Sequence, residues 1–143
     1  MKKVLLILFS LVLVNCTSND DKSPYEGNPE LLGKWKLIEQ LSDPGDGSGI
    51  FNPIDDSNRE IEFFSNGTVT VNGVLCYMSS EVGDQNSGSF SVLENNDYYD
   101  GEIKPNDCDY PETKLYFKIE DPNLIIWYLC IEGCGQKFIK QGK

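Results

Sequence analysis

Histidine is absent from the 143 residues of this chain. Histidine is the commonest general base in proteins and the usual partner of a serine or cysteine nucleophile, so these catalytic arrangements are excluded. Carboxylate pairs remain, and Glu60 and Glu62 share one face of a predicted strand. In so acidic a chain, two acids on a wet face are most simply a solvated surface. We therefore expect a protein that is not an enzyme and needs no cofactor.

Positive charge is scarce: 12 Lys and Arg residues stand against 23 Asp and Glu residues, a net charge of −11. Residues 1–15 contain two lysines and no acid. The rest of the chain therefore has 10 basic and 23 acidic residues, a side-chain charge of −13. A surface of this sign repels phosphate groups. The composition predicts that the protein does not bind nucleic acid and that a basic patch does not attach it to a membrane.

The N-terminal hydrophobic run is too short to span a membrane, which takes roughly 20 apolar residues. It extends from Val4 to Val14, is interrupted only by Ser10, and has eleven residues. Lys2 and Lys3 precede it. A basic start followed by a short apolar run is typical of an export signal. An ordinary secretory signal is the alternative, but small residues such as Ala are missing before the expected cleavage point.

Cys16 closes this segment, and MKKVLLILFSLVLVNC as a whole resembles the signal of a bacterial lipoprotein. The resemblance implies that residues 1–15 are a signal peptide and that Cys16 becomes the lipid-bearing first residue, which anchors the protein to a membrane. The stretch TSNDDKSP that follows resembles the acidic signal that sends Bacteroidota lipoproteins to the outer face of the outer membrane. We expect an outer-membrane, cell-surface location. Residues 16–29 are predicted to be the lipidated N-terminus and a flexible tether.

Apolar residues in the remaining domain recur with a period of two. Leu115 and Phe117 alternate with polar neighbours, as do Val69 and Val71. This pattern predicts strands with one buried and one wet face. Asn66-Gly67, between two such runs, is a strong hairpin signal. Because helical periodicity is lacking, we expect an all-β domain of about eight short strands, folded as a barrel or a sandwich.

Three segments of this domain resemble the lipocalin-like lipoproteins of Bacteroidota, over most of residues 31–141. LLGKWKLIEQ places Gly33-Lys34-Trp35 at the first strand, like the G-x-W motif of lipocalins; the others are IEFFSNGTVTVNG and CIEGCGQKFIK. The resemblance implies a small up-and-down antiparallel barrel over 30–143, which we expect to be monomeric. It also implies that Trp35 packs across the closed end beneath a basic residue of the last strand, either Lys137 or Lys140.

The resemblance further implies that the open end of the barrel can hold a small hydrophobic ligand. The candidates for its lining are the predicted inward side chains Phe63, Val69, Val71, Phe117, Ile125 and Trp127. Each of them also fits a plain core role, and a domain of about 114 residues leaves little room for a cavity. The alternative is a filled barrel that serves as an accessory or protein-interaction module. An interior void of a few hundred Å³ favours the first hypothesis; a packed interior with exposed aromatic residues favours the second.

Four cysteines remain once Cys16 carries lipid, and an even number in an exported chain predicts two disulfides. Cys76, Cys108, Cys130 and Cys134 allow three connectivities, which the sequence does not separate. A local Cys130–Cys134 bridge is geometrically conceivable and leaves Cys76 to pair with Cys108. A metal or redox thiol site is the rival interpretation. Without histidine, a C-x₃-C motif makes a poor zinc site.

Two further segments have alternative interpretations. The run from Leu124 to Ile131 is apolar on both faces, with Ile125 and Trp127 on one of them. Such a strand is covered on both sides or presents an apolar surface to a partner, and we expect the region 78–112 to cover it. In DPGDGSG, Asp43 and its neighbours supply oxygen ligands suited to calcium, but Asp-Pro-Gly is first a turn former.

Overall fold

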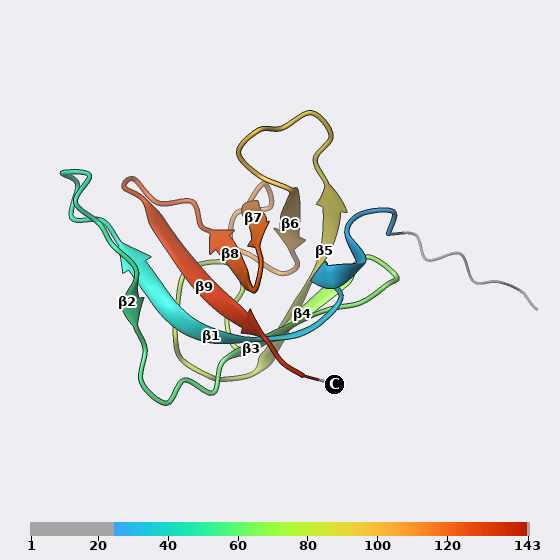
Figure 1. Cartoon of the computed structure of the whole chain (residues 1–143), viewed down its shortest axis with the longest axis horizontal. Helices are drawn as coiled ribbons and strands as arrows, with labels where there is room; N and C mark the ends of the chain where they lie inside the picture. Colours follow the sequence, from blue (N-terminus) through green and yellow to red (C-terminus); the bar gives the residue numbers. More distant parts are fainter. Residues whose placement is uncertain (1–24, 143) are drawn as a thin grey trace, which may run out of the picture.

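The computed structural model describes residues 25–142, so the predicted signal peptide, Cys16 and residues 17–24 lie outside the described part of the chain. The described residues contain no α-helix and form one antiparallel sheet of nine strands (Figure 1). A single 3₁₀ turn, η1 (Pro29–Leu31), precedes them. The strands are β1 (Gly33–Ser42), β2 (Asn52–Pro53), β3 (Glu60–Phe63), β4 (Thr68–Asn72), β5 (Gln85–Val92), β6 (Gly101–Pro105), β7 (Leu115–Glu120), β8 (Asn123–Trp127) and β9 (Cys134–Lys140).

The sheet closes on itself because β1 pairs with both β3 and β9. Eight strands thus form an up-and-down barrel, and the two-residue β2 pairs only with the second half of β1. The register between β1 and β9 shifts between Leu37 and Glu39, which marks a bulge in the long strand β1. Within residues 25–142, closure leaves no open sheet edge except that of the short β2. The predicted all-β barrel of about eight strands is confirmed.

The β3–β4 hairpin turns where Asn66-Gly67 predicts it. The Asn66 carboxamide oxygen accepts a hydrogen bond from the Thr68 amide at 3.0 Å and another from the Thr68 hydroxyl. Gly67 has a φ of +82°, a conformation that glycine adopts without steric cost. The turn chemistry therefore sets the register in which Phe63 faces Val69 and Ile61 faces Val71.

Two disulfides are present within residues 25–142: Cys76–Cys108 and Cys130–Cys134. The first joins the loop after β4 to the loop after β6, 32 residues apart. The second closes the short loop between β8 and β9. Of the three possible connectivities, the structure selects the one with the local bridge.

The outer face of β8 is covered, but not by the region predicted to cover it. Trp127 packs edge-on against Phe51, with 5.8 Å between ring centroids, and Phe51 belongs to the segment that leads into β2. The Nζ of Lys137 lies 4.6 Å from the centroid of the same Phe51 ring. The prediction that 78–112 covers this face is therefore wrong, because that region instead contributes β5 and β6 to the barrel wall.

Within residues 25–142, no helix has the length and apolar character of a membrane span.

Candidate functional site

The barrel interior, where the resemblance implies a ligand, is filled by side chains. Phe63, Val69, Val71 and Phe117 all belong to the buried core. Phe63, Phe90 and Phe117 pack edge-to-face, with ring centroids 5.0 to 6.5 Å apart. Aromatic rings prefer such tilted contacts, and each buries a large area. The centre of the barrel is thus occupied by the protein itself.

Two of the predicted lining residues, Ile125 and Trp127, lie on the outer face of the barrel instead. Alternate residues of a strand point to opposite faces, and it is Leu124 and Ile126 of β8 that join the interior core. Ile125 is flanked in the sheet by Lys118 and Lys137. The prediction of an inward orientation for Ile125 and Trp127 is wrong, because β8 is apolar on both faces and its pattern carries no sign of which face is inner.

One end of the barrel is closed by η1 and Trp35. The Trp35 indole donates a hydrogen bond to the Leu31 carbonyl at 2.8 Å, and the ring is buried. The Nζ of Lys140 lies 4.5 Å from the Trp35 ring centroid and donates to the carbonyls of Glu30 and Leu32. Of the two predicted lysines, Lys140 therefore covers the tryptophan. Lys137 instead pairs with Glu39 and stacks on Phe51.

The other end is closed by the loop 73–84 between β4 and β5, named here the mouth segment. Its Leu75 is buried in the core. The side-chain carboxamide of Gln136 donates a hydrogen bond to the Ser79 carbonyl at 2.8 Å. The Arg59 guanidinium donates to the Glu81 carbonyl at 2.9 Å and to the Val74 carbonyl. Three backbone carbonyls of the mouth segment are thus fixed by side chains of the barrel, and Cys76–Cys108 ties the segment to the β6–β7 loop.

Arg59 is fully buried, and the ion pairs of the described residues do not include it. Its Nε makes no hydrogen bond within this part of the chain. Beside it, the Tyr128 hydroxyl donates to the Gln136 carboxamide oxygen at 2.7 Å, and Gln136 in turn donates to Gln40 at 3.0 Å. Burial raises the pKa of Tyr128, while the nearby Arg59 charge lowers it. The polar network therefore belongs to the closure of the barrel.

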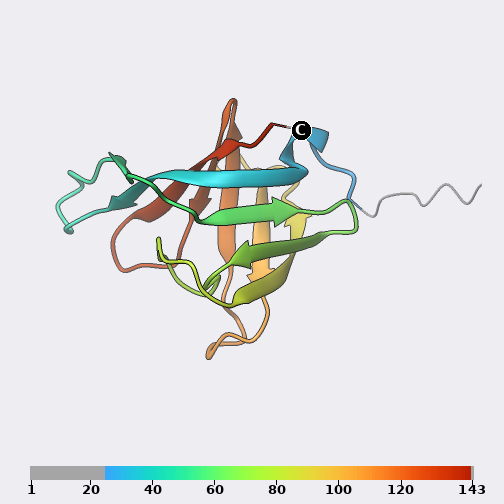
Figure 2. The same cartoon turned by 90° about the horizontal axis from the view of Figure 1, so that it is seen from below.

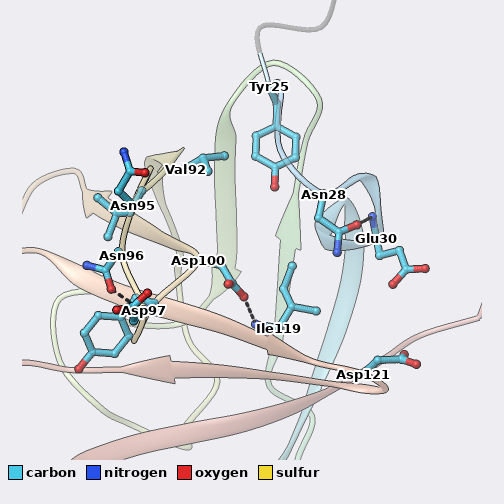
Figure 3. Close-up of a pocket in the computed structure, with 12 residues that line it drawn as sticks. Tyr25, Asn28, Glu30, Val92, Asn95, Asn96, Asp97, Asp100, Ile119 and Asp121 are labelled. Carbon is cyan, nitrogen blue, oxygen red and sulfur yellow. Dashed lines mark hydrogen bonds between the residues drawn. The ribbon is translucent and has the colours of Figure 1, made fainter.

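A concavity of about 530 Å³ lies outside the barrel, at the end closed by Trp35 (Figure 3). Three segments meet there: the N-terminal residues 25–30, the 93–100 loop between β5 and β6, and the β7–β8 hairpin. We call this concavity the rim groove. Its lining consists of Tyr25, Asn28, Glu30, Val92, Leu93, Asn95, Asn96, Asp97, Tyr99, Asp100, Ile119 and Asp121.

The walls of the rim groove are fixed by hydrogen bonds between side chains and the backbone. The Asp100 carboxylate accepts from the Ile119 amide at 2.7 Å, which joins the 93–100 loop to β7 (Figure 3). Asn96 accepts from the amides of Tyr98 and Tyr99, both at 2.9 Å. The Tyr99 ring stacks on Tyr116, with centroids 4.8 Å apart. The groove is therefore shaped before any ligand arrives.

Tyr25 forms the wall opposite Asp100. Its ring packs against Phe90 with 5.0 Å between centroids, so the N-terminal segment is docked onto the barrel. Burial, and secondly the charge of Asp100, raise the pKa of Tyr25. At neutral pH the hydroxyl of Tyr25 therefore keeps its proton.

The rim groove is strongly acidic. Four carboxylates line it, those of Glu30, Asp97, Asp100 and Asp121, and its own lining contains neither Lys nor Arg. Lys140 lines the adjoining concavity, which shares Glu30, Ile119 and Asp121 with the groove. Among residues 25–142, no group of three or more Asp, Glu or Cys side chains is arranged to hold a metal ion. The carboxylates are spread along the groove, and this spacing suits an extended cationic ligand better than a single small ion.

Two other acidic segments serve the fold. The Asp43 carboxylate accepts hydrogen bonds from the amides of Gly45, Gly47 and Gly49 at 2.7 to 3.1 Å, which builds the turn after β1. These bonds, that from Gly49 foremost, lower the pKa of Asp43. In DPGDGSG, the Asp43 carboxylate is thus used to form a turn, which accounts for its position without a calcium ion. Glu62 lies on the outer face of β3, 3.9 Å from the Lys34 ammonium.

Sequence reasoning did not find the rim groove as a site. Asn95-Asn96-Asp97 is recognisable from sequence as a loop between strands, and Tyr25 falls within the predicted tether. The only sequence signal is the density of Asn and Asp in loops at one end of the barrel, which becomes meaningful once the strand order is known.

Comparison with known proteins found no match to this chain among protein-family models, curated proteins or solved structures.

Proposed function

We propose that this protein is an exported, lipid-anchored protein whose filled lipocalin-like barrel acts as an interaction module at the cell surface, and that the rim groove binds a basic segment of a partner. The observation that carries the proposal is the meeting of four carboxylates, from three separate chain segments, in one groove whose own lining has no basic residue. The lipoprotein-like segment ending at Cys16 supports the anchor. The G-x-W motif, with Trp35 beneath Lys140 at one end, supports the likeness to lipocalins.

The charge of the whole protein favours such a partner. With a side-chain charge of −13 outside residues 1–15, the molecule attracts cations and repels anions over distances set by the ionic strength. The groove concentrates four of these negative charges on a shaped surface. Electrostatic complementarity of this kind raises the association rate and selects against acidic partners.

The packed interior argues against the alternative of an apolar ligand held inside the barrel. Such a ligand requires a void of roughly 300 Å³ or more, usually lined by hydrophobic side chains. The residues predicted to line it are either in mutual contact in the core, as Phe63 and Phe117 are, or on the outer face, as Ile125 and Trp127 are. Both barrel ends are also closed by hydrogen-bonded segments.

The proposal is tested by binding of a fluorescein-labelled tetralysine peptide to the full-length protein in maltoside micelles. The double variant Asp97→Asn/Asp121→Asn removes two groove charges. The matched control Asp55→Asn/Asp56→Asn removes two charges from an exposed loop at the opposite end of the barrel. Exposed ion pairs contribute about 0.2–1 kcal/mol each, so the loss of two should weaken binding about two- to thirty-fold.

The control variant should change the affinity less than two-fold by the same reasoning, since it alters only the distant field. Equal losses in the two variants would show that the peptide senses net charge alone, and the groove would lose its assigned role. Binding of a tetraglutamate peptide as tight as that of tetralysine would also contradict the proposal.

A further inference from the structure

A second concavity, of about 350 Å³, lies at the barrel end opposite the rim groove. One wall comes from the mouth segment and the other from the 106–114 loop between β6 and β7, the loop at the bottom of Figure 2. Tyr77 stands on the first wall and Tyr110 on the second, and their side chains are 61% and 80% exposed. We call this concavity the tyrosine cleft. Exposed aromatic rings on both walls of one cleft are not needed by the core.

The backbone of the tyrosine cleft is held on both sides. Cys76 and Cys108 form a disulfide that joins its two walls directly. Behind Tyr77, the mouth segment is anchored by the buried Leu75. On the other wall, the Thr113 hydroxyl donates to the Tyr110 carbonyl at 2.7 Å. A ligand that enters therefore orders few groups beyond the two tyrosine side chains, which lowers the entropic cost of binding.

The chemistry of the lining selects the charge of the ligand. Asp107 and Asp109 contribute two carboxylates, and neither Lys nor Arg lines the cleft. An anion would meet only negative charge, while a neutral apolar group would desolvate the carboxylates without compensation. A cation with an apolar surface satisfies both parts of the lining, because aromatic faces attract ammonium groups and carboxylates neutralise them.

We propose that the tyrosine cleft binds an organic ammonium group, held between the rings of Tyr77 and Tyr110 and neutralised by Asp107 and Asp109. This site is separate from the rim groove: the two share no lining residue and lie at opposite ends of the barrel. The proposal for the cleft is therefore independent of the function proposed for the groove, and each can fail without the other.

The test compares choline with its neutral isostere 3,3-dimethylbutan-1-ol, by isothermal titration of the full-length protein in maltoside micelles. Two cation–π contacts at an exposed site, with the carboxylates added, should make choline bind at least about ten times more tightly than the isostere. Equal affinity for the two would overturn the proposal, since it would show that shape rather than charge is recognised. Absence of choline binding at millimolar concentration, together with absence of binding of lysine amide, would overturn it as well.

Lysine amide serves as a second probe because an ammonium group can belong to a small molecule or to a side chain of a partner protein. Tighter binding of choline supports the cleft as a site for a small quaternary ammonium compound. Tighter binding of lysine amide supports the cleft as a site for a lysine side chain. Both results support recognition of an ammonium group, and they separate its two sources.

Matched variants locate the site. Tyr110→Leu should weaken choline binding about two- to five-fold, the worth of one exposed cation–π contact. Tyr98→Leu removes a tyrosine that is 77% exposed in the loop at the opposite end, and should leave the affinity unchanged. Likewise, Asp109→Asn should weaken binding while the distant Glu94→Gln should not. All four side chains are exposed, so the variants should fold. Equal effects of the Tyr98 and Tyr110 variants would contradict the location.

Discussion

Replacing Phe117 by alanine tests whether the barrel is filled. Phe117 is 1% exposed, and its ring packs against Phe63 and Phe90 with centroids 5.9 and 6.5 Å away. A buried phenylalanine removes roughly 150–250 Å² from water. At about 25 cal/mol per Å², this area corresponds to about 4–6 kcal/mol. Measured Phe→Ala substitutions in cores cost about 3–5 kcal/mol. We expect Phe117→Ala to lower the free energy of unfolding by about 4 kcal/mol.

Urea unfolding of the full-length protein, with Phe64→Ala as the control, measures this loss. Phe64 is 38% exposed and follows the inward-facing Phe63, so the same chemical deletion there should cost less than about 1.5 kcal/mol. A domain of this size is typically stable by about 5–15 kcal/mol, so Phe117→Ala should remain folded but close to the threshold.

A neutral fluorescent dye, Nile red, supplies the second measurement. The wild-type barrel should take up neither this dye nor benzene, whereas Phe117→Ala opens an apolar void that benzene can enter and the larger dye cannot. Equal destabilisation by Phe64→Ala and Phe117→Ala would refute the packing argument. Stoichiometric uptake of Nile red by the wild-type protein, lost when Phe63 or Phe117 is enlarged to Trp, would refute the filled interior.

Three other predictions follow from the same structure. Gly101→Ala places a Cβ onto the Phe117 ring and the Ser91 carbonyl, so unfolding free energy should fall by about 1–3 kcal/mol; Gly83→Ala, where the added atom meets nothing within 4 Å, should change it little. Burial raises the pKa of Tyr128 in the folded state above its unfolded value near 10. The stability that the protonated Tyr128 contributes is therefore complete below pH 10 and is lost as the pH rises through the raised pKa. Tyr128→Phe should flatten that alkaline decline in thermal unfolding curves, and an unchanged slope would contradict the assignment. Intact mass spectrometry should show a mature chain that lacks residues 1–15 and carries acyl groups on Cys16. Cys16→Ser should abolish both the acylation and the recovery of the protein in the membrane fraction. An unmodified Cys16 in the mature wild-type protein would contradict the proposed lipid anchor.

The strands of the barrel follow from local chemistry, which is why the sequence predicts them well. Residues such as Val69 and Val71 alternate with threonines, and Asn66-Gly67 demands a tight turn, so each hairpin is specified by neighbouring residues. The disulfide pairing is a different case. It depends on which loops the closed barrel brings together, and that information is distributed over the whole strand order.

The orientation of β8 marks the limit of the alternation argument. A period of two separates the faces of a strand but does not say which face is inner when both are apolar. The outer face here is covered by Phe51, a residue in a loop whose position depends on β2 and the bulge in β1. No residue within β8 indicates that Phe51 covers its outer face, so the sequence predicts the wrong orientation for Ile125 and Trp127.

The rim groove and the tyrosine cleft escape sequence analysis for the same reason. Asp97 and Asp121 are remote from Tyr25 along the chain, and they meet only because loops at one end of an up-and-down barrel converge. Tyr77 and Tyr110 are brought together by closure of the barrel and by the Cys76–Cys108 bridge. Loop residues of this kind carry no periodicity that would single them out.

The packing of Tyr25 against Phe90 would also limit the distance between the barrel and a membrane, if Cys16 carries the proposed lipid anchor. Eight residues, 17–24, lie between Cys16 and Tyr25, and each of the nine steps along a fully extended chain spans at most about 3.3–3.6 Å. With Cys16 held by lipid at the bilayer surface, as proposed, Tyr25 reaches no farther than about 32 Å from it. A basic partner in the rim groove would then work within reach of the lipid headgroups, while the tyrosine cleft, at the far end of the barrel, can face outward to the medium.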